Sequence, residues 1–182
     1  MIRICISGMT ASGKTSLGHM LAKELNIMHI TKHTLDAYHK TMEQAKKDGG
    51  GHIKIVETAD QRFAKKFDDE IVEMAGKNNC VVTTWLGPWL VKDATLRVWL
   101  NAPIDERAAR RAKELGIAKE EARKLIEEKD RLTINAFKEI QKIDVHDHSE
   151  FEMELNTHRL SQKEMVAVIS MMALNKEKKL FV

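Results

Sequence analysis

The chain has 182 residues, of which 43% are hydrophobic, so it can bury the core of one ordinary domain and no second full domain is expected. Thirty Lys and Arg stand against 27 Asp and Glu, and a net charge of +3 is too small to favour binding to nucleic acid or to a membrane surface. No apolar run reaches the roughly 18 residues of a membrane span, and Cys5 and Cys80 lie in separate apolar runs, where free thiols are common. We therefore expect a reduced, cytoplasmic, monomeric protein.

The hydrophobic pattern alternates between short apolar runs and longer stretches of helical period. The predicted strands are 2–7, 27–30, 80–84, 95–100 and 151–155, and the predicted helices are 14–25, 35–47, 58–77, 103–115, 119–142 and 161–175. Strands that alternate with helices predict an α/β fold, in which a five-stranded parallel sheet is covered by helices on both faces.

The stretch GMTASGKTS, residues 8–16, ends the first strand and opens the first helix. It fits the phosphate-binding pattern G-x-x-x-x-G-K-[ST] at Gly8, Gly13, Lys14 and Thr15. The glycines let successive N–H groups point at phosphate oxygens, Lys14 brings a charge to the β- and γ-phosphates, and the Thr15 hydroxyl can ligate magnesium. We predict a nucleoside triphosphate site made of Gly8, Ala11, Ser12, Gly13, Lys14, Thr15 and Ser16.

Three arginines, Arg107, Arg110 and Arg111, lie in the helix that follows the fourth strand. Open α/β sheets bind ligands at the carboxyl ends of their strands, and phosphoryl transfer needs cations around the transferring group. We predict a catalytic role at the phosphate for Arg110 and Arg107. The alternative is a surface ion pair with an acid of the same helix, namely Asp105, Glu106 or Glu114.

The segment 113–142 is helix-forming and unusually polar, with few residues that could anchor it in a core. Two interpretations are open: a helical lid over a cleft, or a solvated surface hairpin.

Together with GMTASGKTS, three further stretches resemble nucleoside monophosphate kinases, and among these the archaeal-type cytidylate kinases. They are LRVWLNAPIDERAARRAKELGIAKEEA at 96–122, FKEIQKID at 137–144, and LNT followed by LSQKEM within 155–165. The resemblance implies a P-loop kinase fold with a helical monophosphate-binding region at about 34–77 and a lid at about 113–142. It also implies phosphoryl transfer from ATP to CMP or dCMP, with Mg²⁺ as cofactor and small-molecule nucleotides as partners.

The chain departs from the family pattern where the acceptor should be held. Ala37 stands where the family has an arginine, and TTW at 83–85 stands where it has Glu-Gly-Arg. The family's Asp-Arg-Arg is DDE at 68–70, and Ile134 and Ala136 replace arginines of the lid. Charge-assisted hydrogen bonds contribute about 1.5–3 kcal/mol each. Losing several of them would cripple transfer to CMP unless other cations substitute.

Residues that could fill these roles follow from the same comparison. Asp68 survives and is predicted to face the substrate. Trp85 is predicted to be a stacking wall for an altered acceptor, a plug in a closed acceptor pocket, or simple core packing. Substitute cations could be Lys32, Arg62, Lys65, Lys66, Lys129 and Arg131.

Three functions therefore remain open on the sequence. The first is a nucleoside monophosphate kinase. The second is a nucleotide-binding module that kept the loop and lost the transfer reaction, and the third is a kinase with a different small-molecule acceptor.

Overall fold

The computed structural model describes residues 1–47 and 61–179. Within these residues lies a five-stranded sheet in the order β2-β3-β1-β4-β5, and all neighbouring strands are parallel. The strands are β1 Arg3–Gly8, β2 Met28–Ile30, β3 Cys80–Val82, β4 Leu96–Asn101 and β5 Met153–Asn156. The predicted α/β fold with five parallel strands is confirmed.

The helices follow the predicted order with three differences. They are α1 Lys14–Leu25, α2 Asp36–Lys47, α4 Gln61–Lys77, α5 Gly87–Leu90, α6 Ile104–Leu115, α7 Lys119–Ala136 and α8 Gln162–Lys179. The predicted helix 58–77 starts at Gln61 in the described part, and residues 58–60 lie outside it. Two short elements were not predicted, the 3₁₀ turn Lys32–Thr34 and α5. The predicted helix 119–142 widens into a π turn at Phe137–Gln141 and stops at Lys142, whose φ is 59°.

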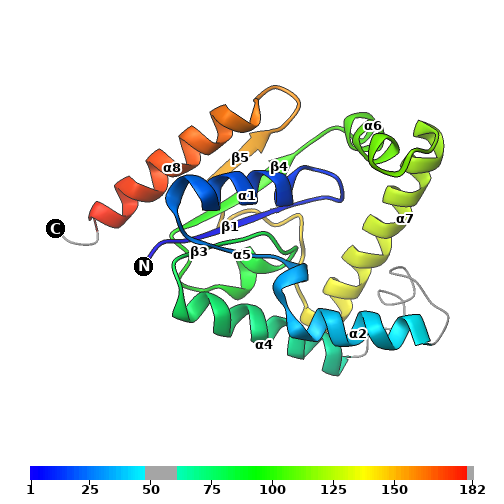
Figure 1. Ribbon diagram of the computed structural model, residues 1–182, viewed down its shortest axis with the longest axis horizontal. Coiled ribbons are helices and arrows are strands. Elements are labelled where there is room, and N and C mark those ends of the chain that lie inside the picture. The colour runs from blue at the N-terminus through cyan, green and yellow to red at the C-terminus, as the bar shows by residue number, and fades with distance from the viewer. Residues whose placement is uncertain (48–60, 180–182) are drawn as a thin grey trace.

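Alternate residues of β1 point into two separate apolar layers, as the pleat of a strand requires. Ile4 and Ile6 pack with Leu17 of α1 and with residues of α8. Cys5 faces the other way and packs with Ile71 of α4. Figure 1 shows α1 and α8 over one face of the sheet and α4 and α5 over the other. The sheet is therefore covered on both faces, and its carboxyl-terminal edge is left for a site.

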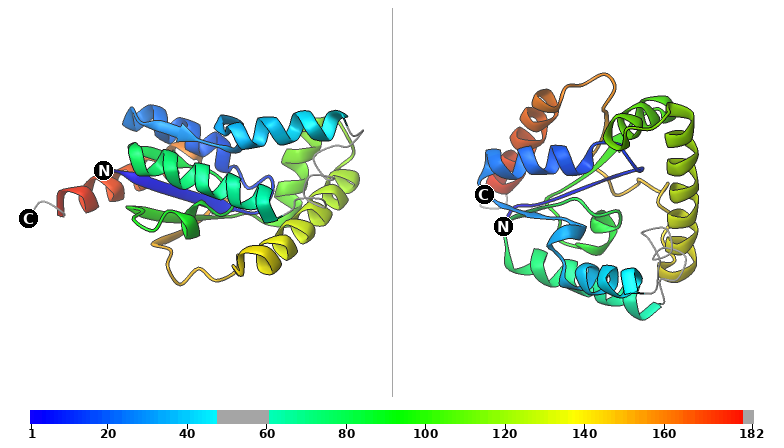
Figure 2. Two further views of the ribbon diagram at one scale, coloured as in Figure 1. Left: turned by 90° about the horizontal axis from the view of Figure 1, so that it is seen from below. Right: turned by 45° about the vertical axis from the view of Figure 1, so that its right-hand side comes forward.

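The helices α6 and α7 lie beyond that edge. Gly116 ends α6 in the left-handed conformation, with φ 68°, and its N–H donates to the carbonyl of Ala112. The chain then turns into α7, which runs from α6 towards α2 and α4 in Figure 1 and in the right-hand view of Figure 2. The segment 113–142, which is predicted to be a lid, comprises the end of α6, the helix α7 and the π turn that follows it. Residues 48–60 of the predicted monophosphate-binding region, 34–77, lie outside the described part of the chain.

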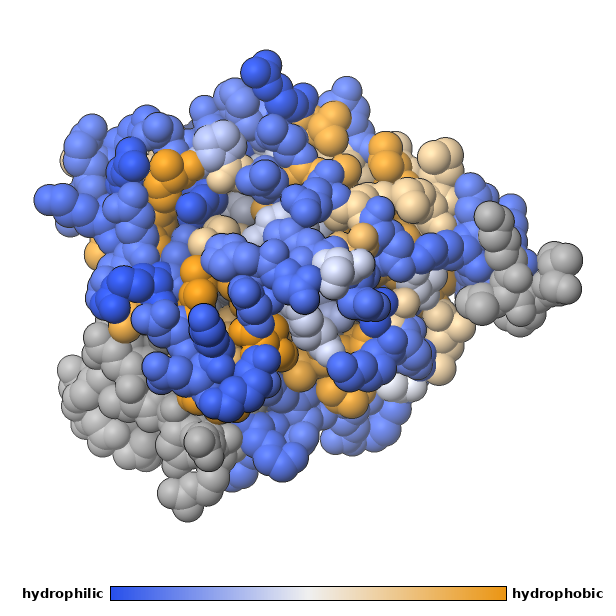
Figure 3. Space-filling model, turned by 180° about the vertical axis from the view of Figure 1, so that it is seen from behind, coloured by the Kyte–Doolittle hydropathy of each residue, from blue (hydrophilic) through white to orange (hydrophobic). Residues whose placement is uncertain are grey.

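Figure 3 shows apolar side chains gathered in bands between polar ones on one face of the molecule. Over all the described residues, the most exposed large apolar side chains are Met1 and Met171, at 57% and 58%. None of the helices in the described residues has both the length and the apolar character that crossing a membrane requires.

Candidate functional site

The phosphate loop is shaped by three residues with positive φ: Gly8 at 148°, Ala11 at 61° and Gly13 at 98°. A Cβ at Gly8 would lie 2.5 Å from the carbonyl oxygen of Leu100, so only glycine fits against β4. Helix α1 begins at Lys14 without a side-chain cap. Its first N–H groups therefore have no acceptor within the helix, and with the helix dipole they favour a bound anion.

The Lys14 side chain turns back onto its own loop. Its ammonium donates to the carbonyl oxygens of Gly8 at 2.5 Å and Met9 at 2.8 Å, and it lies 5.1 Å from the centre of the Trp85 ring. Burial lowers the pKa of Lys14 to about 7, and the Asp130 carboxylate opposes this shift. The ammonium is held by neutral oxygens and a ring face, and a phosphate would offer it a full negative charge.

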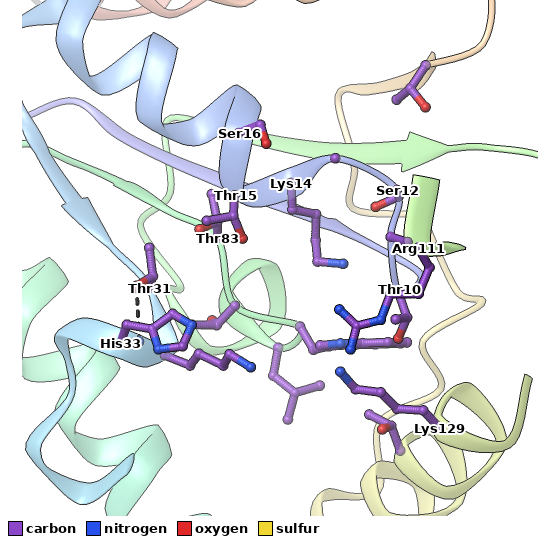
Figure 4. Close-up of a pocket in the computed structure, with 18 of the residues that line it drawn as sticks. Thr10, Ser12, Lys14, Thr15, Ser16, Thr31, His33, Thr83, Arg111 and Lys129 are labelled. Carbon is purple, nitrogen blue, oxygen red and sulfur yellow. Dashed lines mark hydrogen bonds between the residues drawn. The ribbon is translucent and has the colours of Figure 1, made fainter. Parts of the chain in front are cut away.

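The loop opens into a pocket of about 940 Å³, at the upper end of the range usual for ligand sites. Residues 10–16 form one wall, and Lys129 of α7 lies on the opposite side (Figure 4). Thr133 of the same helix also lines the pocket. The pocket continues from the loop to residues 83–86 and to Asp68 on α4. A single cavity thus joins the predicted donor site to the predicted acceptor site.

Arg110 joins the phosphate loop to the segment after β5. It donates to the carbonyl oxygen of Ser12 at 3.2 Å, and to Oγ1 and the carbonyl oxygen of Thr157 at 2.9 and 2.8 Å. It lines the pocket, and a Cβ at Gly13 would lie 3.9 Å from its Nη1. The guanidinium therefore sits over the donor half of the site and bonds no acid of its own helix in these contacts.

Arg107 lies outside the pocket, although it is only three residues from Arg110 on α6. It is buried, pairs with Asp130 at 2.6 Å, and donates to the carbonyl oxygens of Thr10 and Ala102. The other Asp130 oxygen accepts from the Thr10 N–H at 3.0 Å. Arg107 is not among the residues that line the pocket. Its contacts tie α6, α7 and the phosphate loop together, so a direct contact with phosphate would require them to change.

Asp130 is a residue that sequence reasoning missed. It is 4% exposed, in a helix that otherwise reads as a polar surface. The signal that could have found it is its spacing, since Asp130 follows Ala122 and Ile126 at four-residue intervals on the buried stripe of α7.

The acceptor half combines aromatic walls with a carboxyl–amide pair. Trp85 and Phe137 line the pocket, with ring centres 6.0 Å apart. The Trp85 carbonyl accepts from the Ser7 hydroxyl at 2.7 Å, which fixes the turn after β3. Because the ring lines an open pocket, its position favours a wall over a plug.

The carboxyl–amide pair consists of Asp68 and Gln141. The Gln141 Nε2 donates to Asp68 at 3.4 Å, and burial raises the pKa of Asp68 to about 6. The Gln141 Oε1 is buried without a partner among the described residues. The pair thus keeps free acceptor capacity at the pocket wall.

Only some of the predicted substitute cations reach the pocket. Lys32 and Lys129 line it, together with Arg111. Lys65 and Arg131 instead form exposed ion pairs with Asp69 and Glu128. Lys66 is exposed, and the side chain of Arg62 lies outside the described part.

The residues fit a magnesium ion that arrives with a nucleotide. Magnesium prefers oxygen ligands and usually keeps several waters beside substrate phosphates. Thr15 and Thr84 both line the pocket, and Thr84 Oγ1 is buried without a partner among the described residues. Nowhere in residues 1–47 and 61–179 do three or more His, Cys, Asp or Glu gather as a metal site.

Comparison with known proteins agrees with this geometry. Residues 3–159 match the cytidylate kinase-like family. A protein of Sulfurisphaera tokodaii named cytidylate kinase is 34% identical over 170 residues, which cover 91% of this chain and 92% of that protein. The crystal structure of an uncharacterized protein from Eubacterium ventriosum superposes with a TM-score of 0.71 at 17% identity, covering 93% of this chain and 96% of that one. Shikimate kinase from Bacteroides thetaiotaomicron gives 0.55 at 19% identity and covers 100% and 99%. These two structures share the P-loop kinase fold with the chain.

Proposed function

The chain belongs to the cytidylate kinase-like family, and on that premise we propose that it transfers the γ-phosphoryl group of ATP to CMP or dCMP. One observation carries the proposal: the phosphate loop and the wall formed by Asp68 and Trp85 share a single pocket of about 940 Å³. A donor and an acceptor nucleotide can meet there without leaving the cavity.

The donor is held by the loop and the start of α1. The N–H groups of the first helical turn bind phosphate oxygens, and Lys14 exchanges the carbonyls of Gly8 and Met9 for the β- and γ-phosphates. The Thr15 hydroxyl would hold an Mg²⁺ that arrives with the nucleotide, and the ion would neutralise phosphate charge. Arg110, fixed between Ser12 and Thr157, positions the donor and stabilises the transferring group.

The acceptor is held on the other side of the pocket. A phosphate oxygen of CMP forms a bond to the γ-phosphorus while the bond to the bridging oxygen of ADP breaks, and the products are ADP and CDP. A monophosphate oxygen is already ionised, so transfer needs no general base.

The base of the acceptor stacks against one face of the aromatic wall, because the Trp85 and Phe137 rings, 6.0 Å apart at an interplanar angle of 59°, leave no space for a base between them. The acceptor oxygens of Asp68 and Gln141 suit an exocyclic amino group. The helix α7 excludes water from the transferring phosphoryl group.

The test is ATP-dependent release of ADP with a panel of acceptors in the presence of Mg²⁺. The panel contains CMP, dCMP, UMP, AMP, GMP, shikimate and gluconate. We expect CMP or dCMP to raise the rate well above the acceptor-free rate. If none of the seven does so while calorimetry still detects ADP binding, the protein is a nucleotide-binding module or uses another acceptor.

A Lys14→Ala variant is the control for this assay. Loss of the loop lysine should remove the transfer activity. Activity that survives the change unaltered belongs to a contaminating kinase.

A further inference from the structure

Three cationic side chains from three separate segments line the same part of the pocket. Lys32 comes from the turn after β2, Arg111 from α6 and Lys129 from α7. Figure 4 shows the nitrogen ends of Arg111 and Lys129 directed into the space that Lys14 also faces. Burial lowers the pKa of Lys32, and the nearby charge of Arg111 lowers it further. Burial, followed by the charges of Lys32 and Arg111, lowers the pKa of Lys129 to about 8.

The negative charge around this cluster does not balance it. Glu114 pairs with Arg111 at 2.8 Å but is 63% exposed. Asp130 lies near Lys129, and its two oxygens already serve Arg107 and the Thr10 N–H. In the described part of the chain, Lys32 and Lys129 make no ion pair. The Lys32 ammonium lies 5.3 Å from the centre of the Tyr38 ring, and the charge of Glu114 only partly opposes the lowering of its pKa.

Like charges held together in a half-buried pocket repel one another and lose hydration. A bound dianion would reverse both effects, because each cation would gain a charged partner. The cluster is therefore arranged for an anion, and it adjoins the loop where the γ-phosphate of the donor lies in the proposed function.

We propose that Lys32, Arg111 and Lys129 form the receptor for the phosphate of the acceptor. The receptor replaces the family arginines whose positions Ala37 and Trp85 occupy in this chain. It supplies the missing charge from the turn after β2 and from the two helices beyond the sheet edge. This inference rests on the proposed function, and it fixes the acceptor as a phosphate-bearing molecule.

The charge of the cluster favours phosphate over carboxylate. Three cations match the two negative charges of a monophosphate better than the single charge of a sugar acid. The receptor thus separates this chain chemically from kinases of the same fold whose acceptors carry only a carboxylate.

The test uses the full chain saturated with ADP and measures binding by calorimetry. Inorganic phosphate, CMP, uncharged cytidine and gluconate are titrated in turn. The variants are Lys32→Met, Arg111→Met and Lys129→Met. Lys124→Met is the matched control, because Lys124 is an exposed lysine of α7 that does not line the pocket.

We expect each of the three receptor variants to weaken binding of phosphate and of CMP about ten- to a hundredfold. Binding of cytidine should change less than twofold, and Lys124→Met should behave as the unmodified protein. The affinity for ADP should also stay within about twofold in Lys32→Met. None of the receptor variants should melt at a lower temperature, since each removes one of the repelling charges.

The results separate this proposal from the proposed function. If Lys32→Met and Arg111→Met bind phosphate as tightly as Lys124→Met, or if gluconate binds as tightly as phosphate, the receptor is refuted. Failure of the ADP complex of the unmodified protein to bind phosphate at millimolar concentration also refutes it. If phosphate binds with the expected variant pattern while no monophosphate is phosphorylated, the receptor stands and the kinase activity does not.

Discussion

Asp68 is a carboxyl group whose ionised form is poorly solvated, and burial raises its pKa from 3.8 to about 6. Because the folded protein binds this proton more tightly than the unfolded chain does, the contribution of Asp68 to stability falls as the pH rises from about 4 to about 6. Above pH 6 Asp68 is ionised in the folded protein, and the full free-energy cost of burying its charge remains. We expect Asp68→Asn to raise the free energy of unfolding at pH 7 by about 1–2 kcal/mol, allowing for partial exposure.

Thermal unfolding at pH 4 and pH 7 checks this prediction. The difference between Asp68→Asn and the unmodified protein should be present at pH 7 and should nearly vanish at pH 4. Asp69→Asn is the control, since Asp69 is exposed and pairs with Lys65. A variant that is less stable than the unmodified protein at pH 7 would contradict the argument.

Lys14 makes nucleotide binding depend on pH. Its pKa is about 7 in the free protein, and bound phosphates raise it. Nucleotide binding should therefore take up close to one proton at pH 8 and much less at pH 6, and the affinity for ADP should fall as the pH rises through this interval. Calorimetry in buffers of different ionisation enthalpy measures the uptake.

The Lys129→Met variant tests whether this proton belongs to Lys14. Lys129 also has a lowered pKa, about 8, so uptake that persists in the variant assigns the proton to Lys14. Equal uptake at pH 6 and pH 8 would exclude Lys14 as its source.

At the scale of elements, Asp130 joins α7 to the phosphate loop and to α6. In Asp130→Asn the amide can still accept from the Thr10 N–H, but Arg107 is left as a buried cation without a counter-charge. We expect a loss of about 3 kcal/mol in the free energy of unfolding, measured by urea denaturation.

A double-mutant cycle with Arg107→Met separates the ion pair from general damage to packing. Removing both charges should cost clearly less than the sum of the single changes. Additive losses would mean that the two residues stabilise the fold independently. The acceptor affinity of the double variant then reports how far α7 depends on this link to close the site.

The sequence predicts elements better than it predicts how they meet. The phosphate loop follows from its spacing, and the five strands follow from short apolar runs. The sequence does not predict the different positions of Arg107 and Arg110. Both lie on one helix, and only packing against residues 10 and 157 distinguishes them. The ion-pairing and loop contact of Asp130 cannot be predicted for the same reason, since its partner Thr10 lies 120 residues away.

The sequence does not predict the short elements, for a different reason. The helix α5, Gly87–Leu90, is only four residues long and has a proline in its first turn, so it carries no hydrophobic period to detect. The widening at Phe137–Gln141 interrupts a continuous helical pattern, and Phe137 there contacts the Trp85 ring. Both elements lie in or next to the acceptor half of the site. At functional sites the conformation often departs from the one that the local sequence favours.

For the whole molecule, a nucleotide should act as a stabiliser, because the loop that binds it lies between the central strand and α1. At a concentration of one hundred times Kd, ADP should add about 2.7 kcal/mol to the free energy of unfolding. For a chain of this size that corresponds to a rise of about 5–10 °C in Tm. Thermal scans with and without ADP measure it, and Lys14→Ala should show little or no rise. A rise of equal size in that variant would place nucleotide binding outside the loop.

The order of strands also sets when the site can exist during synthesis. Strand β1, which leads into the loop, is made before both of its neighbours, although it is the middle strand of the sheet. Its neighbours are Cys80–Val82 and Leu96–Asn101, so it has no partner until β3 has left the ribosome and is paired on both sides only after β4 has followed. Such distant parallel pairing closes slowly, and the apolar run Ile4–Ile6 is exposed to aggregation meanwhile. The strand that leads into the phosphate loop thus takes its place between two partners only after both of these later strands have been made.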